Sequence, residues 1–187
     1  ILADAKDADM AAGLAAPGSD PGKKQYRTLA EYRQIMRDVL DQGLIDILLM
    51  SVSSSEILTL REKRFERSAV TPAIRANDTT DIHLAQGGRY PAQPSRPFRT
   101  AHLDHAQCGK LACEPGERIA GANLGLYSIT FNNDVNLDLP AIEAYKTFRL
   151  EAEAKAFRHF LENFDPHQCR CHCPPDLGPF ITDQVVR

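Results

Sequence analysis

The stretch that most constrains the fold is residues 123–134, which read Asn-Leu-Gly-Leu-Tyr-Ser-Ile-Thr-Phe-Asn-Asn-Asp. Its apolar part, with aromatic and branched side chains, is typical of a buried strand. The polar Asn-Asn-Asp end cannot extend that strand and predicts a turn. A helical pattern follows at once, so the stretch is a strand–turn–helix unit of an α/β protein. In such proteins ligands bind at the carboxyl ends of the strands.

The same strand pattern occurs at four other places along the chain, namely residues 1–5, 44–51, 70–75 and 158–164. The segment 44–51 is almost continuously apolar, which indicates a strand covered on both faces, as in a parallel sheet. Strands that alternate with helices in this way are expected to run parallel, with right-handed crossovers.

Helix starts and stops can also be located from local signals in the sequence. Thr28 with Glu31 predicts a capping box, in which each side chain binds a free backbone amide of the first turn. Ser53 with Glu56 predicts a second one, and Asp138 is expected to cap the helix after the opening strand. A last helical stretch is expected at about residues 174–187.

These elements predict a single α/β domain over residues 1–187, with a long irregular loop at about residues 85–122 where several prolines interrupt regular structure. Two architectures fit the pattern. One is a complete doubly wound sheet that binds a small ligand. The other is a (β/α)8 TIM barrel of about 250 residues, truncated here to about five βα units. The first residue is not methionine and the last helix is cut off at the chain end, which favours the truncated barrel.

Composition narrows the class of function. The formal net charge of −3 over 187 residues indicates neither a nucleic-acid surface nor an acidic tail. The absence of a long apolar run predicts no membrane span, and no secretion signal is evident. An odd number of cysteines, five, argues against a disulfide framework, so a cytoplasmic location is expected. An open sheet edge would favour a homo-oligomer.

Three groups of segments resemble a known family. They are residues 3–10 (Ala-Asp-Ala-Lys-Asp-Ala-Asp-Met), 48–51 with 71–82, and 124–134 with 159–162. They are similar to bacterial proteins related to the class I aldolase barrels, the deoxyribose-phosphate and fructose-bisphosphate aldolase-like group. The resemblance implies a lyase that acts on a small carbonyl compound or phosphosugar without a cofactor. It also implies a Schiff-base lysine and a phosphate site on later barrel strands, outside this chain.

The polar strand ends supply the candidate substrate-binding residues. Arg75, Asn77 and Asp78 follow the third strand, and Asn132 and Asp134 follow the fourth. Arginine could clamp a carboxylate or phosphate with its two-pronged guanidinium, although a structural ion pair with Asp78 would look the same in sequence. Asp134 is a candidate catalytic group, and an Asx turn is its simpler interpretation.

Two further candidates for catalysis are Lys6 and Glu162. Asp4 is a further candidate for substrate binding. With Lys6 and Asp9 it has a spacing similar to one in the orotidine-phosphate decarboxylase group of barrels, in which a lysine between carboxylates can deliver a proton. A solvated charged turn is the competing interpretation. Glu162 lies within an apolar strand, on the same side as Phe160, where a carboxylate must be paired or functional.

The cysteines are candidate metal ligands. Cys108 and Cys113 lie in the long loop, and Cys169, Cys171 and Cys173 lie close together near the end of the chain. Four such groups could hold a structural zinc ion, which would make the chain a zinc-stabilised binding or scaffold domain instead of an enzyme. The favoured expectation remains an aldolase-like carbon–carbon lyase, which this chain alone would not complete.

Overall fold

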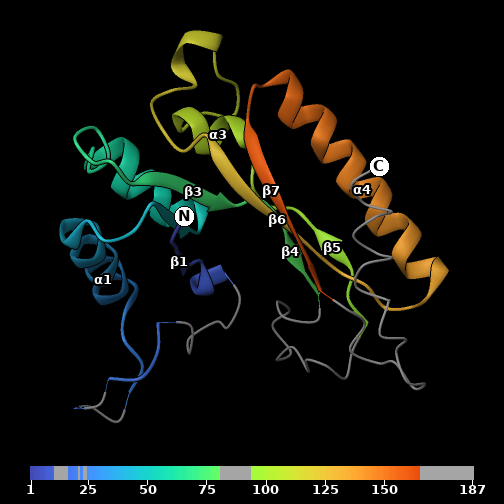
Figure 1. Ribbon diagram of the computed structural model, residues 1–187, viewed down its shortest axis with the longest axis horizontal. Coiled ribbons are helices and arrows are strands. Elements are labelled where there is room, and N and C mark those ends of the chain that lie inside the picture. Colours follow the sequence, from blue (N-terminus) through green and yellow to red (C-terminus); the bar gives the residue numbers. More distant parts are fainter. Residues whose placement is uncertain (11–16, 21, 23–24, 81–93, 165–187) are drawn as a thin grey trace.

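The computed structural model describes residues 1–10, 17–20, 22, 25–80 and 94–164. Five parallel strands make the main sheet: β1 (Ala3–Lys6), β2 (Ile47–Met50), β3 (Thr71–Arg75), β6 (Leu124–Thr130) and β7 (Arg158–Phe164). Their order in the sheet, β1-β2-β3-β6-β7, is their order in the chain. The sheet curls into half of a barrel, with the helices placed around its outside (Figure 1). All five predicted strands are confirmed.

A doubly wound sheet does not fit this arrangement. Such a sheet reverses its strand order at a switch point. Among the described strands each one instead pairs in parallel with the preceding strand of the main sheet, from β1 with β2 to β6 with β7. The α/β class is therefore confirmed, and the architecture is a curled, singly wound half-barrel.

The helices follow the strands as the alternation predicts. They are α1 (Leu29–Gln42), α2 (Val52–Ser55) continued by the π-helix η3 (Glu56–Arg61), α3 (Leu103–Cys108) and α4 (Val135–Ala154). Two single turns of 3-10 helix, η1 (Ala8–Met10) and η4 (Pro115–Glu117), complete the described helices. The predicted capping box of Thr28 and Glu31 begins α1, and Gly43 ends it with a positive φ of 64°.

Two predicted helix starts were wrong. The cap of α2 is Ser51, whose hydroxyl accepts from the Ser54 amide at 3.2 Å, and not Ser53. The cap of α4 is Asp134, whose carboxylate accepts from the Asn136 amide at 2.8 Å, and not Asp138. In both cases the turn between the strand and the helix supplies the capping side chain, one residue after β2 ends and four residues after β6 ends.

The stretch expected to be irregular contains regular structure. A two-stranded antiparallel sheet joins β4 (Asp78–Thr79) to β5 (Pro97–Phe98), and α3 follows β5. The apolar face of α3 explains this helix, because Leu103 and Ala106 are buried in the same cluster as side chains of β6 and α4. The helix is only six residues long, too short for its periodicity to stand out in the sequence.

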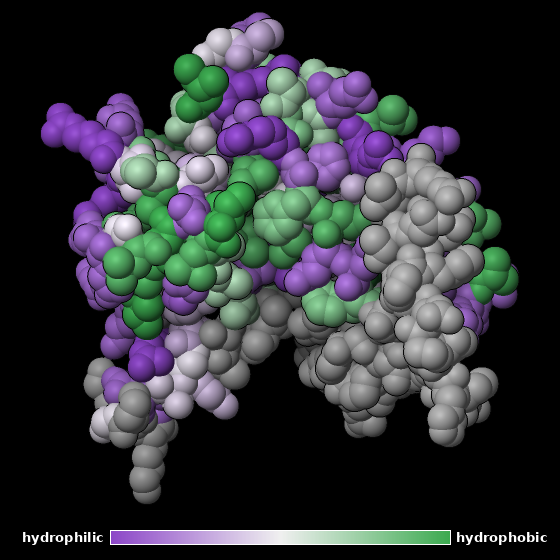
Figure 2. All heavy atoms as spheres, in the orientation of Figure 1, coloured by the Kyte–Doolittle hydropathy of each residue, from purple (hydrophilic) through white to green (hydrophobic). Residues whose placement is uncertain are grey.

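Two faces of the sheet differ in what covers them. On the helix-covered face, Leu48 and Met50 pack with Tyr32, Met36 and Leu40 of α1. On the opposite face, which we call the inner face, the buried apolar cluster of Leu49, Ala73 and Leu126 comes from strands alone. Apolar side chains gather near the centre of the view in Figure 2, with polar ones beside them. No described helix is both long and apolar enough to cross a membrane.

Candidate functional site

The centre of the candidate site is Arg75, the last residue of β3, whose side chain is only 10% exposed. Its Nη1 donates to Asp7 Oδ2 at 2.9 Å, and its Nε donates to the Asn77 carbonyl at 3.0 Å. Nε also lies 3.5 Å from Asp78 Oδ1. Arg75 therefore ties the end of β1 to the end of β3, because Asp7 directly follows β1.

A chain of hydrogen bonds extends from Arg75 to the last strand of the sheet. Arg75 Nη2 donates to Ser128 Oγ in β6 at 3.3 Å, and Ser128 Oγ donates to Glu162 Oε2 in β7 at 2.9 Å. Ser128 and Glu162 are register partners, so their side chains share one face. We call the set Asp7, Arg75, Asp78, Ser128 and Glu162 the Arg75 network; it joins the carboxyl-terminal halves of four strands.

The side chain of Asn77 binds the backbone of Ser128. Its side-chain Oδ1 accepts from the Ser128 amide at 2.7 Å, and its Nδ2 donates to the Ser128 carbonyl at 2.8 Å. The pair of bonds imitates one rung of a sheet ladder beyond the last paired residues of β3 and β6. The amide of Asn77, predicted to bind substrate, is thus used to position Ser128.

Three carboxylates belong to the network, those of Asp7, Asp78 and Glu162. The Arg75 guanidinium contacts Asp7 and Asp78 directly and reaches Glu162 through Ser128. Asp7 and Asp78 are 8% and 3% exposed. Carboxylates removed from water are costly unless they are paired or hydrogen-bonded. Carboxylates gathered at the carboxyl ends of parallel strands are the arrangement expected of a functional site.

The surroundings of the network are apolar and partly open. Along the inner face the network continues into Leu126 and Ala73, which are buried, and into Phe160, which is 38% exposed. Phe160 pairs with Leu126, which in turn pairs with Arg75, so the three residues form one row across the sheet. A ligand at this end would meet carboxylates and a hydroxyl above an apolar floor.

Asp4 and Lys6 lie apart from this network. Lys6 Nζ donates to Asp4 Oδ1 at 2.6 Å. The register pairs Asp4 with Leu48 and Lys6 with Met50, both on the helix-covered face. Because side chains alternate along a strand, Lys6 points away from the face that carries Asp7 and Arg75. The structure therefore does not bring the lysine and the other candidate catalytic groups together.

Asn132 and Asp134 make their contacts outside the Arg75 network. Asn132 Oδ1 accepts from the Ser95 amide at 2.7 Å, and its Nδ2 donates to the Ser95 carbonyl at 2.8 Å. Asp134 is exposed and caps α4. The Asx-turn interpretation thus describes Asp134, while Asn132 anchors the segment before β5 to the end of β6.

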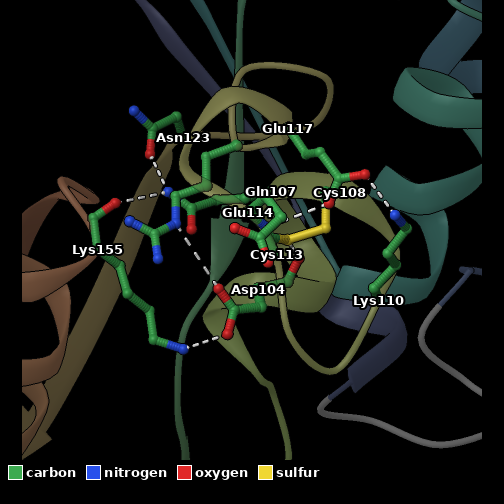
Figure 3. Close-up of a disulfide and its surroundings, with 10 residues drawn as sticks. Asp104, Gln107, Cys108, Lys110, Cys113, Glu114, Glu117, Asn123 and Lys155 are labelled. Atoms are coloured by element: carbon green, nitrogen blue, oxygen red, sulfur yellow. Dashed lines mark hydrogen bonds and ion pairs between the residues drawn. A yellow bond between two sulfur atoms is a disulfide. The ribbon is translucent and has the colours of Figure 1, made fainter.

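The cysteine predictions divide into two groups. Cys108 and Cys113 form a disulfide that closes the turn after α3, with Cα atoms 6.2 Å apart (Figure 3). Their prediction as zinc ligands is therefore wrong, because a disulfide has no thiolate to bind the metal. Cys169, Cys171 and Cys173 lie outside the described residues. Within the described ranges no group of three or more potential ligands could hold a metal ion.

Two members of the network, Asp7 and Ser128, were missed from the sequence. Ser128 lies between Tyr127 and Ile129 in a largely apolar strand, and its polar partners lie on the neighbouring strands, so the sequence gives no local signal for it. Asp7 lies 68 residues from Arg75, a contact that only the curl of the sheet creates. Glu162 was predicted correctly to share a face with Phe160.

Comparisons with known proteins add no identity to these observations. No protein-family model matches the chain, and no curated protein shows significant similarity to it.

Proposed function

We propose that the half-barrel is part of a (β/α)8 barrel and that the protein is an aldolase-type lyase. Its substrate would be a small carbonyl compound or phosphosugar. The observation that supports this proposal is the Arg75 network, which gathers three carboxylates at the carboxyl ends of parallel strands. In barrel enzymes the catalytic groups come from this end of several different strands.

The curl and the strand order support the barrel. Each strand pairs with the next strand of the sheet in chain order, as in a singly wound barrel. The inner face would then become the barrel interior, and further strands would cover the half-exposed Phe160 and Phe164. A second copy of the chain could cover the same edges, so self-association belongs to the proposal.

The direction of the hydrogen bonds gives Glu162 its role. A guanidinium has no acceptor, so Arg75 must donate to Ser128 Oγ. The single hydroxyl hydrogen of Ser128 is then directed to Glu162 Oε2, which is therefore an acceptor. A carboxylate held in this way is suited to accept a proton from a substrate hydroxyl, as a general base.

Aldol cleavage uses such a base. The base removes the proton of the hydroxyl group, the electrons of that O–H bond form the new carbonyl, and the adjacent carbon–carbon bond breaks. The electron pair of the broken bond passes to an iminium formed between the substrate and a lysine. Lys6 faces the other side of the sheet. As the resemblance to aldolases implies, the proposal assigns the Schiff base to a lysine on a later barrel strand, outside this chain.

Borohydride trapping tests the proposal. The natural gene product that contains this chain is incubated with dihydroxyacetone phosphate, glyceraldehyde 3-phosphate or pyruvate, reduced with sodium borohydride, and analysed by mass spectrometry. We expect an adduct on one lysine. Glu162→Gln should keep the adduct but lower turnover by about 10²–10⁴-fold, as expected for loss of a general base.

The matched control is Glu66→Gln, which removes a carboxylate that is 61% exposed and pairs with Lys63 on the surface. This variant should keep full turnover. Absence of a reduced adduct with every carbonyl compound, or normal turnover in Glu162→Gln, would reject the aldolase assignment.

A further inference from the structure

The outer side of α4 carries apolar side chains that the fold leaves exposed. The helix packs on the sheet through Ala141, Phe148 and Ala152, which are buried. Leu139 lies nine residues before Phe148, two and a half turns away, so the two side chains point in opposite directions. Leu139 is 53% exposed and Leu150 is 62% exposed. A helix that is apolar on two opposite sides is typically covered on both of them.

Four exposed residues form one line along this outer side of the helix. They are Leu139, Glu143, Lys146 and Leu150, and we call them the α4 ridge. Their spacing of four, three and four residues places them above one another on the helix surface. The ridge therefore has a leucine towards each end and two opposite charges in the middle.

This pattern is complementary to itself when a second copy of the helix lies antiparallel. Leu139 lies four residues after the start of α4, and Leu150 lies four residues before its end. Glu143 and Lys146 lie eight residues from the start and from the end. A two-fold axis through the middle of α4 therefore places Leu139 opposite Leu150 of the second copy. The same axis places Glu143 opposite Lys146 of the second copy.

The charges of the α4 ridge favour this orientation over a parallel one. Within the described ranges neither Glu143 nor Lys146 belongs to an ion pair, so both are available for contacts with another molecule. In an antiparallel pair each carboxylate faces an ammonium group. In a parallel pair Glu143 would face Glu143 and Lys146 would face Lys146, which is unfavourable.

Closing a barrel would leave the α4 ridge exposed. The helices of a (β/α)8 barrel form a ring around the strands, so further units would contact the flanks of α4 and the edges of the sheet. The ridge instead points outwards, because α4 lies on the outside of the curled sheet (Figure 1). A surface in this position is suited to contact a separate molecule.

We propose that the protein forms a two-fold symmetric dimer in which the α4 ridges of two copies pack antiparallel. Such an interface is the same patch on both copies, as expected of a symmetric dimer. The proposal is independent of the lyase assignment, because no ridge residue belongs to the Arg75 network. It is also distinct from association through the edges of the sheet, which lie on other elements.

Sedimentation equilibrium of the natural gene product that contains this chain tests the proposal. One helix pair is a small interface, so we expect a weak dimer, measured at about 10–300 µM protein. Glu143→Lys and Lys146→Glu each create two like-charge contacts across the two-fold axis. Each should therefore raise the Kd at least about tenfold. The double variant Glu143→Lys/Lys146→Glu restores opposite charges at both contacts and should return the Kd to near its original value.

The matched control is Lys63→Glu, which reverses the charge of a lysine that is 64% exposed and lies outside α4. It should leave the Kd unchanged. A protein that stays monomeric over the whole concentration range would overturn the proposal and leave the ridge to a different partner. A dimer that neither single reversal weakens forms through another surface, such as the sheet edges, and would also overturn it. So would a double variant that dimerises no better than the single ones.

Discussion

Two ionic clusters occupy opposite ends of the sheet and differ in what they join. The Arg75 network lies at the carboxyl ends of the strands and brings three carboxylates together around Arg75 and Ser128. The second cluster is centred on Asp104 of α3, whose side chain is 9% exposed and contacts both Lys155 and Arg118. Lys155 precedes β7, so this cluster lies at the amino ends of the strands.

The Asp104 cluster joins α3 to the segments that lead into β6 and β7. Figure 3 shows Lys155 directed at Asp104, with Gln107 directed at Asn123 beside the disulfide. Gln107 Nε2 donates to Asn123 Oδ1 at 2.7 Å and to the Lys155 carbonyl at 3.1 Å. We infer that the Asp104 cluster stabilises the fold, whereas the Arg75 network lies at the end of the sheet where barrel enzymes bind their ligands.

The largest expected effect separates the two clusters by stability. Arg75→Met should lower the free energy of unfolding by about 3–5 kcal/mol, because the buried Asp7 then loses the guanidinium that pairs with it. Lys155→Met should cost only about 1–3 kcal/mol, because Arg118 stays 3.9 Å from Asp104. Urea unfolding measures both, with Lys110→Met as the exposed control. The reverse ranking would remove the proposed distinction.

The disulfide gives the second effect, at the Asp104 end of the sheet. The chain-entropy relation for a loop closed by cysteines five residues apart gives about 2 kcal/mol of stabilisation. Cys108→Ser/Cys113→Ser should therefore unfold at lower urea concentration than the oxidised chain, and reduction should have the same effect. Equal midpoints before and after reduction would show that other contacts already close this loop.

A third prediction tests the link between Arg75 and Glu162. Ser128→Ala should cost only about 1 kcal/mol, the usual net value of a hydrogen bond. Under the proposed function it should nevertheless lower turnover, because Glu162 loses the donor that holds it. Ser128→Thr keeps the hydroxyl and serves as the control. A stability loss as large as that of Arg75→Met would make Ser128 a structural residue.

The smallest effect comes from an exposed pair that sets the baseline for both clusters. The pKa of Glu62 lies below its usual value of 4.5, and the largest cause is the pair of hydrogen bonds that Arg37 donates to its carboxylate. Because the folded-state pKa is depressed, the stabilisation is present above pH 4.5 and is lost as the pH falls through the folded-state value. Glu62→Gln should therefore flatten the acid side of the stability curve by less than about 1 kcal/mol. An identical curve for the variant would exclude this contribution.

The sheet could be predicted from sequence because strand patterns are local. The apolar runs that contain β2 and β6 have covered side chains on both faces, which an unbroken run indicates directly. The turn chemistry was less certain. Asp134 and Asp138 are both good caps, and only the position of the strand end decides between them.

The site could be predicted only in part, because its contacts are not local. Arg75 and Glu162 were found as polar residues in or next to apolar strands. The face of Lys6 could not be found, because β1 is only four residues long and its alternation of alanine with Asp4 and Lys6 does not show which face is covered. Likewise, the spacing of Cys108 and Cys113 permits both a metal site and a disulfide, and only the path of the loop after α3 distinguishes them.

The order of the strands has a consequence for how the protein folds during synthesis. β1, β2 and β3 can pair as soon as residue 75 has been made, since each partner immediately precedes the next in the sheet. β6 joins only after a long connection, although closing a loop of twice the length costs only about 0.6 kcal/mol more. The Asp7–Arg75 ion pair can therefore form first, as a template on which Ser128 and then Glu162 dock.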